Sequence, residues 1–122
     1  MSHLNFIDEE QEDLVMLIKK NRTIDEYKKA GAKIRLFKHL GAKVAEDISK
    51  VISTSDYKIL EGALHRIDVV CSRAEDNMFS DFPELGSEYV DVFYGNVKDK
   101  PRNTLDKEII QMAKKASDDL FE

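Results

Sequence analysis

Residues 56–75 read DYKILEGALHRIDVVCSRAE, and this stretch decides the fold class. Its apolar residues recur at steps of three and four, which is the period of one face of an α-helix. The apolar face comprises Ile59, Leu60, Ala63, Leu64, Ile67, Val70, Cys71 and Ala74. A face this wide predicts a helix over 56–75 that lies at the centre of a helical domain.

A second apolar stripe precedes this helix. Thr23 followed by Glu26 is typical of a helix N-terminus, where the two side chains cap free backbone amides. The stripe then comprises Tyr27, Ala30, Ile34, Phe37, Leu40, Val44, Ile48, Val51 and Ile52. Gly41 stands where a glycine commonly ends a helix. The pattern predicts two helices, 24–39 and 42–53, hinged at Gly41, with one bent helix as the alternative.

Further helices are predicted at both ends of the chain. Residues 8–21 begin with acidic residues and end with basic ones, as the helix dipole favours. Thr104 is a candidate cap for a helix over 105–120. Residues 86–95 are rich in strand-forming types, but a lone strand would have no partner among helices. We therefore predict a short helix over 86–95.

The composition agrees with a helical domain. Of the 122 residues, 42% are hydrophobic, which is sufficient for a core, and the five Gly and two Pro are few for the turns of an all-β fold. A chain of this length usually forms one domain. We expect an all-α fold for 1–122, a compact bundle of five or six helices.

The expected location is the cytoplasm. Cys71 is the single cysteine, so the chain cannot form an internal disulfide. No window of 18 apolar residues is present that would predict a membrane span. Residues 1–13 lack the basic and apolar regions of a signal peptide.

No catalytic, metal or cofactor site is predicted. The sequence contains no glycine-rich phosphate loop, nucleophile elbow or Cys-x-x-Cys motif. Glu61, His65 and Asp68 share one face of the central helix, but that face lies opposite the apolar one and is expected to face solvent. Cys71 belongs to the apolar face, where a thiol is normally structural.

Charge segregation is the feature most suggestive of function. Between Ala74 and Val97 there are six acidic residues, no Lys or Arg, and five of the ten aromatic residues. Rigid rings surrounded by carboxylates suit the binding of a basic protein surface. The predicted partner-binding residues are Phe79, Phe82, Glu84, Glu88, Tyr89, Asp91, Phe93 and Tyr94. We expect a small non-catalytic binding or regulatory protein that docks a basic protein partner through residues 77–97.

Other interpretations remain open at this point. The rings of 77–97 could close the core, and its acids could pair with the basic window 19–43 within one chain or across a homodimer. A nucleic-acid-associated regulator could use the basic helix 24–43, although the net charge of −5 is unusual for that class. A ligand-binding or enzymatic bundle with a pocket near His65 and the rings is the second alternative.

Overall fold

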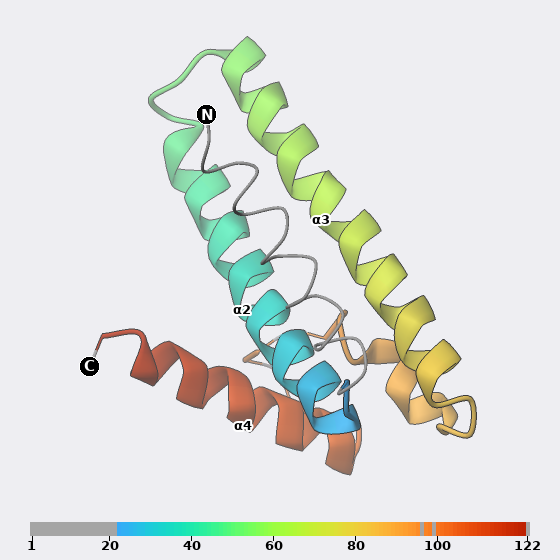
Figure 1. Ribbon diagram of the computed structural model, residues 1–122. Helices are drawn as coiled ribbons and strands as arrows, with labels where there is room; N and C mark the ends of the chain where they lie inside the picture. The colour runs from blue at the N-terminus through green and yellow to red at the C-terminus, as the bar shows by residue number, and fades with distance from the viewer. Residues whose placement is uncertain (1–21, 96, 99, 122) are drawn as a thin grey trace, which may run out of the picture.

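The computed structural model describes residues 22–95, 97–98 and 100–121. Within these ranges the chain forms three α-helices, α2 (Ile24–Ile48), α3 (Thr54–Asp81) and α4 (Thr104–Asp119), and no strand (Figure 1). A 3₁₀ helix, η1 (Ser87–Asp91), lies in the segment between α3 and α4. The all-α class is confirmed, but the predicted five or six helices are too many for this part of the chain. The predicted helix 8–21 lies outside the described residues.

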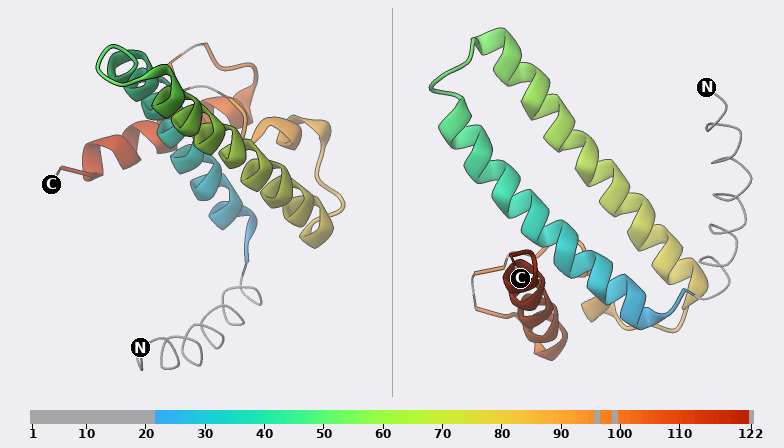
Figure 2. Two further views of the ribbon diagram at one scale, coloured as in Figure 1. Left: turned by 90° about the horizontal axis from the view of Figure 1, so that it is seen from above. Right: turned by 60° about the vertical axis from the view of Figure 1, so that its left-hand side comes forward.

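α2 and α3 form a long antiparallel hairpin, and α4 crosses α2 near its N-terminal end (Figure 2). Ion pairs between Arg22 and Asp81 (2.9 Å) and between Lys38 and Asp68 (3.0 Å) set the register of the hairpin. Residues 82–95 fold back towards α2 and place η1 against α4.

The predicted helix break at Gly41 is wrong, because α2 runs through this residue without interruption. The backbone of Gly41 does not adopt the left-handed conformation, with positive φ, that ends many helices. A Cβ atom at this position would lie 2.8 Å from Leu64 Cδ2. The glycine therefore allows α3 to approach closely, and the alternative of one helix is the better description.

Other predicted boundaries also shift. The helix predicted over 56–75 is α3, which continues past the predicted end at Glu75 to Asp81, and Met78 in the added turns is fully buried. The prediction that it lies at the centre is wrong within the described residues, because α2 is the helix that packs against both α3 and α4. It ends where Pro83 disfavours a helical conformation for Phe82. The predicted helix 86–95 is reduced to the five residues of η1.

Side-chain caps mark the start of each α-helix. Thr23 Oγ1 accepts from the amide of Glu26 (3.1 Å), as predicted, and Ser53 Oγ accepts from the amide of Asp56 (3.1 Å). At α4 the cap is Asn103 rather than the predicted Thr104, and its Oδ1 accepts from the Asp106 amide (2.8 Å). Each cap satisfies an amide that the first helical turn leaves unpaired.

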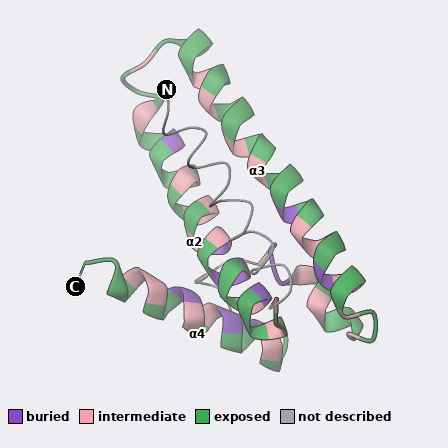
Figure 3. Ribbon diagram, in the orientation of Figure 1, coloured by how far each residue is buried: buried purple, intermediate pink, exposed green. Residues whose placement is uncertain are grey.

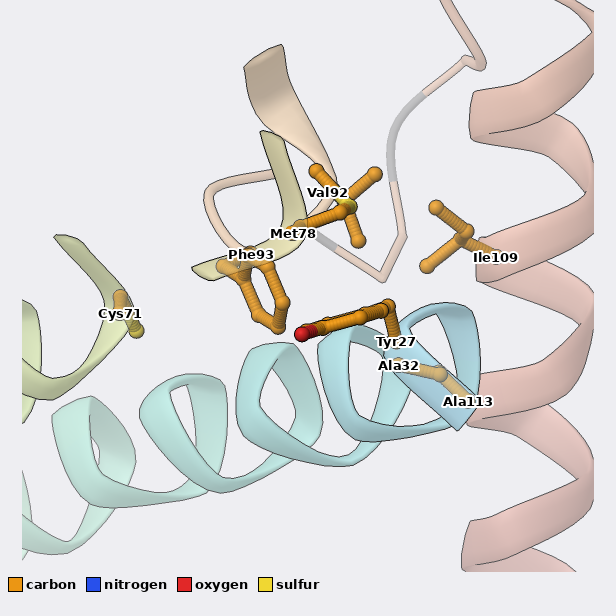
Figure 4. Packing of buried hydrophobic residues seen from close by; sticks show 8 residues of the cluster. All are labelled: Tyr27, Ala32, Cys71, Met78, Val92, Phe93, Ile109 and Ala113. Carbon is orange, nitrogen blue, oxygen red and sulfur yellow. The ribbon is translucent and has the colours of Figure 1, made fainter. Parts of the chain in front are cut away.

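The core is confined to the end of the hairpin where α4 and η1 pack (Figure 3). Its buried cluster consists of Tyr27, Ala32, Cys71, Met78, Val92, Phe93, Ile109 and Ala113 (Figure 4). Further along the hairpin, the predicted inward residues Phe37, Leu40 and Val44 are 51%, 57% and 44% exposed. The expectation that they are buried is wrong within the described residues, because the end of α4 borders Phe37 and Leu40 without covering them.

Candidate protein-docking surface

Arg35 holds the acidic-aromatic segment in place. The Arg35 side chain is buried, and its Nη1 donates to Asp106 Oδ1 on α4 at 2.7 Å. Its Nε donates to the carbonyl of Val92 (3.0 Å) and its Nη2 to the carbonyl of Asp91 (2.7 Å). One guanidinium thus joins α2, α4 and the end of η1. The sequence placed Arg35 within the basic window 19–43 but did not indicate its partners.

Asp106 is the second member of this network. Its Oδ2 accepts from the backbone amide of Arg102 (3.0 Å), and its Oδ1 also accepts from Arg102 Nη2 (3.2 Å). Burial by itself would raise the pKa of Asp106, but the hydrogen bonds from Arg102 and Arg35 outweigh it and lower that pKa to about 2. Arg102 also forms a half-exposed ion pair with Asp91 of η1, in which Nη1 and Oδ2 are 2.8 Å apart.

The predicted rings lie at different depths. Phe93 is 2% exposed and belongs to the core, so it offers no area to a partner. Phe79, Phe82 and Tyr89 are half-buried and pack against the core, where Phe82 meets Tyr27 edge to face at 6.2 Å. Tyr94 is 39% exposed. Among the predicted rings, Tyr94 therefore presents the most accessible surface.

The acidic side chains of this region fall into two groups, exposed ones and ones paired with basic residues of the same chain. Glu84 and Glu88 are exposed. Asp91 pairs with Arg102, and Asp81 accepts from both Arg22 and the Tyr27 hydroxyl. Contacts between the acidic and basic windows within one chain thus account for part of the charge segregation.

The predicted residues do not form one continuous surface. Glu88 and Tyr89 line a groove of about 470 Å³ with Lys28 and Glu108. Phe82 and Glu84 line another groove, of about 330 Å³, beside Pro83. Asp91 and Tyr94 line neither groove, and both interact electrostatically with Glu75 of α3, a residue that the prediction did not include.

Glu75 and its neighbour Asp76 are acidic residues near the C-terminal end of α3. Burial raises the pKa of the Glu75 carboxyl, and the negative charges of Asp76 and Asp91 raise it further. Glu75 is half-buried and makes no hydrogen bond or ion pair with another side chain in the described part of the chain. Burial raises the pKa of the Tyr94 hydroxyl, and the negative charge of Glu75 raises it further. We name Glu75, Asp76, Asp91 and Tyr94 the docking surface.

One basic side chain lies at the edge of this surface. Lys38 Nζ is 5.0 Å from the centroid of the Tyr94 ring, a cation–π distance, and it also binds Asp68. The ring therefore already packs against a cation on one side. The sequence did contain a signal for Glu75 and Asp76, because both belong to the acidic window that follows Ala74.

The structure separates the parts of the predicted ligand pocket. His65 lies in a shallow groove of about 300 Å³ with Glu61 and Asp68. Phe79 is 14 positions further along α3, which corresponds to about 21 Å along the helix axis. Within the described ranges, no group of three or more His, Cys, Asp or Glu side chains is arranged to hold a metal ion. Cys71 is buried, and burial raises the pKa of its thiol.

The basic helix is largely occupied by internal contacts. Lys28 pairs with Glu108 and Lys29 with Asp25, while Arg35 is buried in the network described above. Few positive charges of this helix remain for a phosphate backbone, since nucleic-acid binding depends on several cations that the protein leaves unpaired.

Comparisons with protein-family models, curated proteins and solved structures found no match. Among the described residues, the helices are too polar or too short to cross a lipid bilayer.

Proposed function

We propose that this chain is a non-catalytic binding protein that docks a basic segment of a protein partner on the docking surface. The observation that carries the proposal is the Glu75 carboxylate, half-buried beside Asp76 and Asp91 and without an ion-pair partner among the described residues. The exposed Tyr94 ring adds apolar area next to these charges.

The physical argument concerns charge repulsion and desolvation. Glu75 already loses hydration on folding and is repelled by two neighbouring carboxylates. A Lys or Arg side chain from a partner would remove this repulsion and form charge-assisted hydrogen bonds. The Tyr94 ring would pack against the apolar stem of that side chain. Glu84 and Glu88 lie further along the same segment and would attract a basic partner at longer range.

Selection of peptides from a random library on the immobilised full-length protein tests this proposal. Enriched peptides should contain Lys or Arg, and their binding should weaken as sodium chloride is added. Glu75→Gln should raise their Kd about tenfold, because it removes the negative charge of a partly desolvated site. Tyr94→Ala should also weaken binding.

The matched control is Glu46→Gln, which removes an exposed carboxylate on the distant half of α2. Its binding should equal that of the wild type. Enriched peptides that lack basic residues, or that bind Glu75→Gln as tightly as the wild type, would contradict the proposal.

A further inference from the structure

One face of α2 is apolar and open along the distal half of the hairpin. Phe37, Leu40 and Val44 follow one another at intervals of three and four residues, so their side chains share this face. They are 51%, 57% and 44% exposed. Contiguous exposed apolar side chains on a small protein usually mark a surface that something covers.

A groove between α2 and the end of α4 adjoins this face. It has a volume of about 410 Å³. Its apolar lining consists of Leu36, Phe37, Leu40, Ala116 and Leu120. Lys33 and Asp119 also line it. A groove of this kind suits the apolar side of an amphipathic helix.

We propose that residues 4–21, which lie outside the described residues, dock along this face as a helix antiparallel to α2. The connection is short, because the sequence predicts a helix to residue 21 and α2 begins at Ile24. Connections of this length join antiparallel neighbours. Fourteen helical residues extend about 21 Å, which is the distance from Ile24 to about Phe37 along α2.

The apolar residues of the segment match this register. Leu14, Leu17 and Ile18 fall beside the first turns of α2, near the exposed Ala30. Phe6 and Ile7 fall about three turns further along α2, next to the groove.

The charges match as well. The acidic run from Asp8 to Asp13 falls beside Lys33, which has no ion pair with another described residue. The basic residues Lys19 and Lys20 fall beside the acidic first turn of α2, formed by Asp25 and Glu26. A second copy of the chain in the same groove would lack the advantage of a tether two residues long. This inference does not rest on the proposed function.

Hydrogen exchange of the full-length protein tests the proposal. The amides of 10–20 should exchange at least about tenfold more slowly than in an unstructured peptide, and the protection should not depend on protein concentration. The double variant Phe37→Glu/Leu40→Glu should abolish this protection. The control Val69→Glu/Val70→Glu adds the same charge at two exposed apolar residues of α3 and should retain it.

Light scattering on the same samples distinguishes the occupants. A monomer with protected 10–20 amides that only Phe37→Glu/Leu40→Glu exposes supports the proposal. Free exchange of these amides in the wild type would overturn it. Protection that appears only with dimer formation would also overturn it and would assign the groove to a second copy.

Discussion

The Arg35 guanidinium connects parts of the chain that lie more than fifty residues apart in sequence. It binds the Asp106 carboxylate and the carbonyls of Asp91 and Val92 while being almost fully buried. A buried pair of this kind need not stabilise the fold more than apolar residues would. Removal of one partner, however, leaves the other charge buried without compensation.

Arg35→Met should therefore lower the free energy of unfolding by about 3–5 kcal/mol. Urea denaturation followed by circular dichroism measures the change. Lys28→Met is the matched control, because the Lys28–Glu108 pair is partly exposed and should contribute less than about 1 kcal/mol. Equal losses of unfolding free energy in the two variants would show that the buried network contributes no more to stability than the partly exposed pair.

Asp106 gives the stability a defined dependence on pH. Its pKa of about 2 in the folded protein lies below the ordinary value of 3.8. The folded state thus binds this proton less tightly than the unfolded state does. The contribution is complete above about pH 4 and is lost as the pH falls towards 2. Urea midpoints between pH 2 and 6 should show this loss, whereas Asp106→Asn should have a flatter profile. Parallel profiles for the two proteins would contradict this assignment.

At the scale of the elements, glycines inside helices decide how closely the segments approach. Gly31 of α2 faces Val92, and a Cβ atom there would lie 2.6 Å from both Val92 Cγ1 and the Val92 carbonyl oxygen. That carbonyl also accepts from Arg35. The backbone next to η1 can therefore lie directly on α2 only because position 31 has no side chain.

Gly31→Ala should accordingly destabilise the protein by about 1–3 kcal/mol, since backbone atoms must move to admit the methyl group. Gly62→Ala is the matched control within α3, where an added Cβ meets nothing within 4 Å. That change should stabilise by about 0.5–1 kcal/mol through helix propensity. Thermal denaturation of both variants measures the difference, and a stabilising Gly31→Ala would contradict the close approach.

The elements also show what sequence reasoning can predict. Local signals located part of the fold: Thr23 caps α2, and Cys71 lies in the core as the helical period indicated. Ile59 and Val70 of the same predicted apolar face are 70% and 59% exposed, so the expectation that they are buried is wrong. Gly41 was misread because a glycine that ends a helix and one that admits a neighbouring side chain look the same in one sequence. The cap at Asn103 was missed by one position, because Asn103 and Thr104 are both residue types that cap helices.

At the scale of the whole molecule, long-range pairing could not be predicted. Nothing local to Arg35 indicates that it meets Asp106, since such a contact depends on how α4 crosses α2. The predicted partner-binding residues were likewise taken from one stretch of sequence, because the sequence does not show which distant residues the fold brings beside them. The fold distributes that stretch over the core, two grooves and the docking surface, where the charge of Glu75 acts on Asp91 and Tyr94.

The position of the core at one end has a mechanical consequence. Beyond the crossing of α4, the paired helices form an arm in which Ala45 is the buried residue of α2 and α3 has none before Cys71. The helix hydrogen bonds of this arm open at a lower free-energy cost than those of the base. A protease would therefore cut the arm near its tip, around residues 49–53, while the body around Met78 stays intact.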